Sequence, residues 1–301
     1  MASFRLANAN SDDLALTDLS REVMTTSYGA MVVSRGDSFF ASLREQYSDA
    51  SVVVCYEKND VLGMGVLAHI HASLFGEPSH AIGYFNQLRS RKSSRGLTFL
   101  SRAYRFMREE CRKSELPLYI TSILEENHDA KRILESGRAG LPTYVPIARL
   151  ATTLMRMTAL TKFVSATAGE TQQFALSTAD GVPYSWDQRR FREILVRNPS
   201  YSARLTASLL FRSIAPLLRN EIDVPLRYLT NWEISPKGFA SDGEELHALT
   251  LDVRDARYEE ALRRSSHTTY STLYGVSWGE SVIISRLRES NAPVYVDAGL
   301  L

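Results

Sequence analysis

The sequence has few cysteines, almost no net charge and no long apolar run. Its two cysteines, Cys55 and Cys111, exclude a disulfide scaffold, and both lie in apolar segments where we expect buried, reduced thiols. The net charge of +1 argues against broad attraction to nucleic acid or membranes, so any anion site must be local. No run of about 18 apolar residues could form a membrane-spanning helix. The first residues also lack the basic and apolar parts of a signal peptide, so we expect a cytoplasmic protein.

The remaining composition is that of a folded globular chain, with 44% hydrophobic and 23% charged residues over 301 positions. That length suffices for one large or two medium domains. Hydrophobic periodicity gives the first half an order of strand, two helices, hairpin, strand, helix, strand and helix. This order predicts an α/β (α+β) fold with a mixed, mostly antiparallel central sheet flanked by helices. The expected strands are 4–7, 51–56, 61–71, 82–88 and 118–124, and the expected helices are 14–26, 39–47, 97–113 and 128–136.

The second half of the chain resembles a diverged repeat of the first half. The segment LESGRAGLPTYVPI at 134–147 has an echo in LRRSSHTTYSTLYGV at 262–276. The small, polar stretch 164–172 suits a linker. We therefore predict a duplicated chain, with one domain at 1–150 and a degenerate second domain at 165–301. In the second half, strands are expected at 226–232, 245–252 and 269–278, and a helix at 255–264.

A basic turn lies between the strand at 82–88 and the helix at 97–113. Unpaired N–H groups at the start of that helix, its dipole and the cationic side chains would all attract one anion. A pyrophosphate fits this turn, and a solvated basic loop is the alternative interpretation. A nucleic-acid contact is disfavoured, because no aromatic residues are interspersed in the run. The cations are Arg89, Arg91, Lys92 and Arg95, and the turn ends at Gly96.

Two short motifs resemble those of the GNAT superfamily of N-acetyltransferases. Arg91-x-x-Ser94-x-Gly96 matches the family's Q/R-x-x-G-x-G/A turn, with serine in place of the middle glycine. Asn127-x-x-Ala130-x-x-x-Leu134 matches the family's N-x-x-A-x-x-x-Y motif except at its last residue. The order of strands and helices over residues 4–145 agrees as well. The resemblance implies a GNAT-like fold and an acyl-CoA cofactor, either acetyl-CoA or another acyl-CoA.

The resemblance also implies where that cofactor binds. Acyl-CoA would lie where the fourth and fifth strands splay apart, with its pantetheine arm paired to the main chain like an added strand. An amine of a small molecule or peptide would attack the thioester directly, while a backbone N–H holds the developing oxyanion. The implied cofactor-binding residues are Asn86, Gln87, Leu88, Arg91, Ser93, Ser94, Arg95, Gly96, Asn127 and Ala130.

Two residues are candidates for the acid–base chemistry. The family's proton-donating tyrosine corresponds to Leu134, which has no proton to give, so Tyr144 is the candidate acid. Glu125 is the candidate base, and its alternative role is that of an acid favoured by the dipole of the helix after it. The missing tyrosine leaves a second function open, that of a non-catalytic acyl-CoA-binding or regulatory protein.

Other groups and partners are expected to be few. His69 and His71 lie two residues apart on a strand, but no further cluster of His, Cys or Asp joins them, so we expect no metal site. The second half lacks a basic turn before its helix, so we expect it to bind no CoA. We expect no nucleic-acid or membrane partner, and either a monomer or a homodimer.

Overall fold

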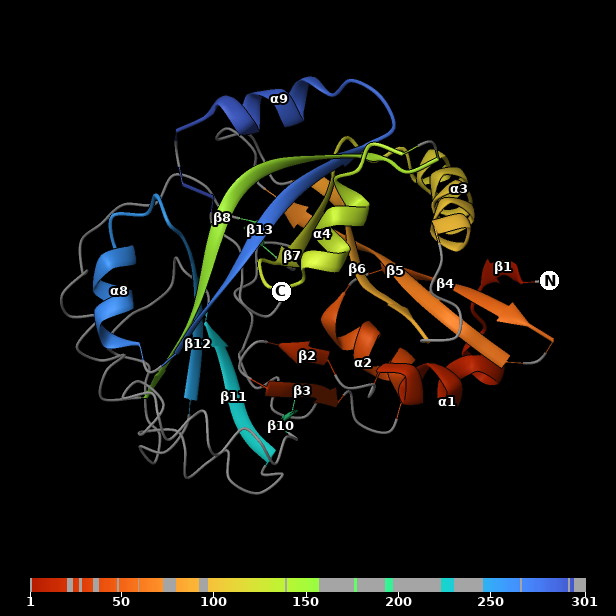
Figure 1. The fold of residues 1–301 in the computed structure, drawn as a ribbon, viewed down its shortest axis with the longest axis horizontal. Coiled ribbons are helices and arrows are strands. Elements are labelled where there is room, and N and C mark those ends of the chain that lie inside the picture. The colour runs from red at the N-terminus through yellow and green to blue at the C-terminus, as the bar shows by residue number, and fades with distance from the viewer. Residues whose placement is uncertain are drawn as a thin grey trace.

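The strands of the computed structural model pair into one mixed sheet with helices on both faces (Figure 1). Along the sheet the order is β1-β4-β5-β6-β7-β13-β8-β12-β11-β10-β3-β2, and β9 pairs with β5. The structure describes residues 2–20, 24–26, 29–34, 38–47, 49–58, 60–72, 80–91, 97–138, 140–156, 176–177, 193–196, 223–229, 246–265, 267–291 and 293–294. The predicted linker at 164–172 lies outside them.

The bounds of the elements follow the chain in order. The strands are β1 (Ser3–Leu6), β2 (Met24–Thr26), β3 (Gly29–Ser34), β4 (Asp49–Glu57), β5 (Asp60–Ala72), β6 (His80–Ser90), β7 (Tyr119–Leu124), β8 (Thr143–Arg156), β9 (Leu176–Ser177), β10 (Glu193–Val196), β11 (Asp223–Leu229), β12 (Leu246–Asp252) and β13 (His267–Ser277). The helices are α1 (Ala9–Ser20), α2 (Phe39–Gln46), α3 (Leu97–Ser114), α4 (His128–Leu134), α8 (Tyr258–Arg264) and α9 (Val282–Glu289).

Most neighbouring strands are antiparallel. Among the described pairings only β6 with β7 and β11 with β12 are parallel. The predicted α/β fold class, with a mostly antiparallel mixed sheet flanked by helices, is therefore confirmed. No helix in the described ranges combines the length and apolarity that crossing a membrane requires.

The centre of the sheet combines both halves of the chain. Strand β13 lies between β7 and β8, so a strand from the second half completes the sheet of the first (Figure 1). Across four neighbouring strands, Leu124 pairs with Ser271, Ser271 pairs with Leu150, and Leu150 pairs with Asp252. On one side of the β13–β8 pair, β13 pairs antiparallel with β7, which pairs parallel with β6. On the other side, β8 pairs antiparallel with β12, which pairs parallel with β11. The pairing pattern is thus the same in both directions, and the sheet is continuous across the predicted boundary near residue 150.

One predicted helix of the first half is wrong in its bounds, and strand β8 was not predicted. The expected helix 14–26 is α1, which begins at Ala9 because Asn8 accepts the N–H of Asn10 and gives its own N–H to Asp12. Its expected end, 24–26, is strand β2 instead, where Thr25 and Thr26 pair with β3. The stretch from 147 onward, where no element was expected, belongs to the long strand β8.

Alternating side chains place one hydrophobic cluster on each face of the sheet. The first cluster lies under α1, α2 and α9, and Leu16, Phe39 and Ile284 are among its members. The second lies under α3 and α4, where Tyr104, Met107 and Cys111 project from α3 at the predicted helical spacing. Both cysteines are buried, unpaired thiols, as expected. Burial raises the pKa of Cys55 to about 11 and that of Cys111 to about 12, so both thiols stay protonated at neutral pH.

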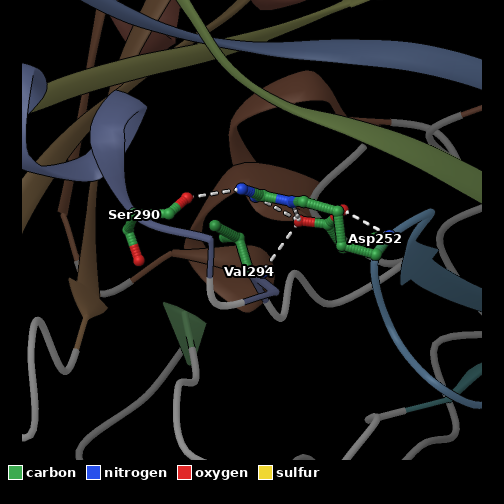
Figure 2. Close-up of polar contacts among 4 residues, drawn as sticks. Asp252, Ser290 and Val294 are labelled. Carbon is green, nitrogen blue, oxygen red and sulfur yellow. Dashed lines mark hydrogen bonds and ion pairs between the residues drawn. The ribbon is translucent and has the colours of Figure 1, made fainter.

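The carboxylate of Asp252, the last residue of β12, is buried. Asp252 is 0% exposed and accepts hydrogen bonds from the backbone N–H and the guanidinium of Arg254, the shortest at 2.6 Å. The backbone N–H of Val294 donates to the same carboxylate at 2.9 Å, and Arg254 donates to the carbonyl of Ser290 at 2.8 Å (Figure 2). These bonds fasten the segment after α9 to the central sheet.

Candidate functional site

The candidate site lies where β6 and β7 diverge. The two strands pair in parallel only at Gly83 with Tyr119 and at Tyr84 with Ile120. One residue further along, the hydroxyl of Thr121 bridges the strands by donating to the carbonyl of Phe85 at 2.7 Å. No described strand pairs with the rest of β6 on this side. Among the described residues, no strand lies beside the main chain of Asn86, Gln87 and Leu88 on this side, so an extended ligand could add hydrogen bonds there.

A β-bulge interrupts β6 at the point of divergence. Val66 of β5 pairs with Asn86 and Met64 pairs with Arg89, so Gly65 faces both Gln87 and Leu88. Gln87 has φ +52°, a left-handed conformation in which the extra residue of a bulge stands outside the ladder. A bulge re-aims main-chain groups, and this one lies within the predicted pantetheine-binding residues Asn86, Gln87 and Leu88.

Apolar surface accompanies the bulge on the α3 side. Leu88 is 45% exposed, which is unusual for a leucine in an inner strand. Gly65 lies beneath it, and a Cβ built at Gly65 would be 3.8 Å from both Leu88 and Met107. This side of the bulge therefore offers hydrocarbon contacts to a ligand that pairs with β6.

The opposite side of β6 carries polar groups near the bulge. The side-chain amide of Asn86 donates to the hydroxyl of Tyr47 at 3.1 Å, and its Oδ1 is buried without a hydrogen-bond partner among the described residues. Tyr84 and Ser122 join β6 and β7 through their hydroxyl groups at 3.2 Å. A main-chain role is predicted for Asn86, but no sequence pattern indicates this side-chain environment.

Asn127 follows the end of β7, and Ala130 lies in the first turn of α4. The Asn127 side chain accepts the backbone N–H of Ala130 at 3.2 Å and so caps α4. The Asn-x-x-Ala spacing thus has a structural role in starting the helix, whether or not a cofactor is bound. Ala130 packs against the second hydrophobic cluster.

Glu125 forms an ion pair with Arg149 of β8. Two hydrogen bonds, of 2.8 and 3.0 Å, join the carboxylate to the guanidinium, which also lies 4.3 Å from the centre of the Tyr270 ring. The hydrogen bond from Arg149 lowers the pKa of Glu125 below its ordinary value. A carboxylate with a lowered pKa is a weaker base, and this pairing opposes the catalytic role predicted for Glu125.

Tyr144 projects from β8 into the second hydrophobic cluster. Its hydroxyl lies 2.5 Å from that of Tyr104, and Leu134 belongs to the same cluster. Burial raises the pKa of Tyr104 to about 12 and that of Tyr144 well above its ordinary value. The Tyr144 hydroxyl is therefore buried, hydrogen-bonded to that of Tyr104 and hard to deprotonate, which opposes the role of a ready acid.

The remaining predicted residues belong to the segment between β6 and α3. Arg91 is exposed, and its backbone N–H donates to the carbonyl of Leu62 at 2.9 Å, which holds Arg91 beside β5. The predicted residues Ser93, Ser94, Arg95 and Gly96 lie outside the described part of the chain.

Among the residues that the structure describes, no cluster fits a metal ion. His69 pairs with Asp49 at 3.3 Å across β4 and β5. Within the described ranges, no three residues of the types His, Cys, Asp and Glu lie close enough together to hold a metal.

Comparison with known proteins gives distant matches only. No family model and no curated protein matches the chain. An N-acetyltransferase from Staphylococcus aureus Mu50 is 14% identical, with 50% of this chain and 85% of that one covered at a TM-score of 0.36. Glucosamine-6-phosphate N-acetyltransferase from Arabidopsis thaliana is 14% identical. The match covers 45% of this chain and 89% of that one, at a TM-score of 0.34. A predicted acetyltransferase with acetyl-CoA from Clostridium acetobutylicum is 10% identical. The match covers 46% of this chain and 90% of that one, at a TM-score of 0.34. These likenesses are too weak to assign an activity to the chain.

Proposed function

We propose that this chain is an acyl-CoA-dependent N-acyltransferase of the GNAT type, which transfers an acyl group, in the simplest case acetyl, directly to an amine. The observation that carries the proposal is the divergence of the parallel pair β6–β7 with a bulge at Gln87 and Leu88. An extended pantetheine arm needs a main-chain edge, and the thioester carbonyl needs an N–H donor beside it. The β6 edge after Phe85 offers both in adjacent residues.

The proposed cofactor runs along β6 from the bulge to the basic turn. Its pantetheine pairs with the main chain at Asn86, Gln87 and Leu88, and its pyrophosphate lies at the turn from Arg91 to Gly96. The amine attacks the thioester carbonyl, and a backbone N–H of the bulge stabilises the negative charge that develops on the carbonyl oxygen. Most of the rate would come from positioning and electrostatics, since the described acid–base candidates are engaged elsewhere.

A second function, acyl-CoA binding without catalysis, is favoured by three observations. Leu134 stands where the family's motif has tyrosine, Glu125 is paired with Arg149, and the Tyr144 hydroxyl is hydrogen-bonded to that of Tyr104. Glu125 as base and Tyr144 as acid remain predictions, as do a small-molecule or peptide amine acceptor, a cytoplasmic location and a monomer or homodimer.

Thermal unfolding with acetyl-CoA tests the proposal. A ligand of the folded state stabilises it by about 2.7 kcal/mol at a concentration of 100 times Kd, so acetyl-CoA should raise the Tm. Replacing Arg91 and Arg95 with alanine should remove that rise. Arg112→Ala is the matched control, because Arg112 is an exposed cation at the other end of α3, paired with Glu109.

The outcomes separate the alternatives. An unchanged Tm with acetyl-CoA and with longer acyl-CoA esters would contradict both functions. A raised Tm followed by thiol release in the presence of primary amines supports the transferase. A raised Tm without thiol release from any amine supports the non-catalytic binder.

A further inference from the structure

Four polar side chains form a row on the face of the sheet that carries α1 and α2. Tyr84 and Asn86 belong to β6, Ser122 to β7 and Ser271 to β13. Their neighbours along the same face, among them Ile82, Ile120 and Leu273, belong to the first hydrophobic cluster. A polar row across the middle of an apolar face is costly unless each polar group has a partner.

Two members of the row have oxygens without partners. Asn86 Oδ1 is buried without a hydrogen bond, and so is the hydroxyl of Ser271, a residue that is 4% exposed. Leaving such a group unpaired costs about 1–3 kcal/mol, which is why unpaired buried oxygens are rare in folded proteins. A ligand that donates hydrogen bonds at these two points would recover that cost.

Both oxygens flank the divergence of β6 and β7. Asn86 directly precedes the bulge at Gln87, and Ser271 pairs with Leu124, the last residue of β7. The row lies on the α2 side, where Asn86 contacts Tyr47, whereas Leu88 faces α3 on the other side. A group bound to the row would therefore approach the bulge from the face opposite to the apolar surface of Leu88.

On the basis of the proposed function, we propose that this row binds the acceptor, with Asn86 as the residue that positions the attacking nitrogen. Asn86 Oδ1 accepts an N–H of the amine, and the Ser271 hydroxyl binds a second polar group of the same molecule. Carboxamide and hydroxyl groups are neutral, so the row suits an uncharged amine rather than an ammonium ion. The carboxylate on the same face, Asp252, is committed to Arg254 and Val294.

The reaction at this position balances without another reactant. The amine nitrogen forms a bond to the thioester carbonyl carbon, the carbon–sulfur bond breaks, and the proton lost by nitrogen is taken up by the CoA thiolate. Ser271 belongs to the strand that the second half contributes, so part of the acceptor-binding row comes from that half.

Hydroxylamine is a suitable probe, because it is a small amine that is uncharged at neutral pH. With acetyl-CoA saturating, the protein should accelerate acetyl transfer to hydroxylamine above the uncatalysed rate. Asn86→Leu should lower kcat/KM for hydroxylamine by about tenfold, the loss of one hydrogen bond made in the transition state. Ser271→Ala should raise KM for a bulkier polar amine, glycinamide, by about threefold to tenfold, without lowering the Tm, since its hydroxyl has no partner to lose.

The control is Ser42→Ala, which removes a buried hydroxyl that donates to the carbonyl of Phe39 within α2. This control should leave the constants for both amines unchanged. Ser271→Ala and Ser42→Ala should keep the wild-type Tm rise with acetyl-CoA, which a general loss of structure would not. The constants of Asn86→Leu are compared at saturating acetyl-CoA, so that a weaker cofactor contact does not count as lost acceptor binding. Wild-type protein without that rise would refute the proposed function itself. A normal rise with no catalysed transfer to hydroxylamine or any other primary amine would contradict the transferase and, with it, the acceptor-binding role. A normal rise and catalysed transfer with unchanged constants in Asn86→Leu and Ser271→Ala would overturn the acceptor-binding role alone.

Discussion

Replacing Asp252 with alanine is expected to lower the free energy of unfolding by about 3–5 kcal/mol. The carboxylate is 0% exposed and accepts hydrogen bonds from two groups of Arg254 and from the backbone of Val294. Without it, the Arg254 guanidinium, which is 29% exposed, loses its counter-charge, and the Val294 N–H loses its acceptor. The segment after α9 would then come loose from the end of β12.

Urea unfolding measures this loss. Arg288→Ala is the matched control, because Arg288 pairs with Glu289 at 3.9 Å on the surface, and exposed pairs contribute less than about 1 kcal/mol. Asp252→Asn should lower the free energy of unfolding by more than Arg288→Ala and by less than Asp252→Ala, because asparagine keeps one acceptor oxygen but no charge. A loss below about 1 kcal/mol for Asp252→Ala would show that this buried ion pair does not hold the segment after α9.

Gly83→Ala is expected to destabilise the protein by about 3 kcal/mol, the upper end of the cost of overpacking a core. A Cβ at this position would lie 2.3 and 2.6 Å from ring atoms of Tyr119. The ring cannot easily move, because it stacks on Phe85 at 5.6 Å and its hydroxyl donates to the Cys111 carbonyl at 2.8 Å. Gly83 also makes one of the two pairs that hold β6 against β7, so the variant should weaken acetyl-CoA binding as well.

Gly279→Ala is the matched control, since a Cβ there meets no atom within 4 Å. A double-mutant cycle isolates the clash, because Gly83→Ala in a Tyr119→Leu background should cost much less than in the wild type. Equal costs in the two backgrounds, again by urea unfolding, would show that the ring of Tyr119 is not what excludes a side chain at position 83.

Local patterns predicted most elements of the first half. The hairpin of β4 and β5, the helix α3 and the strand-to-helix passage at Asn127 depend on periodicity and capping among near neighbours. The placement of β13 between β7 and β8 depends on pairing between residues more than a hundred positions apart, which no local pattern encodes. Segments 134–147 and 262–276 each contain the end of a helix and the start of a strand, and these two strands, β8 and β13, pair side by side.

The candidate site at Asn86, Gln87 and Leu88 is a prediction from motif order, and the structure adds local geometry that the sequence did not indicate. A bulge with Gln87 in a left-handed conformation was not indicated, because no glycine marks it. The partners of the two acid–base candidates are distant in sequence, with Arg149 24 positions after Glu125 and Tyr104 40 before Tyr144. Such partners become apparent only when the strands are placed.

Amide hydrogen exchange with and without acetyl-CoA tests most directly whether the cofactor pairs with β6. We predict that acetyl-CoA slows exchange in residues 81–91 and at the end of β7, while exchange in β12 is unchanged. The other described parallel pair, β11–β12, is the natural alternative location. Protection confined to 223–229 and 246–252, or no protection of 81–91 despite a raised Tm, would contradict a cofactor bound at the bulge.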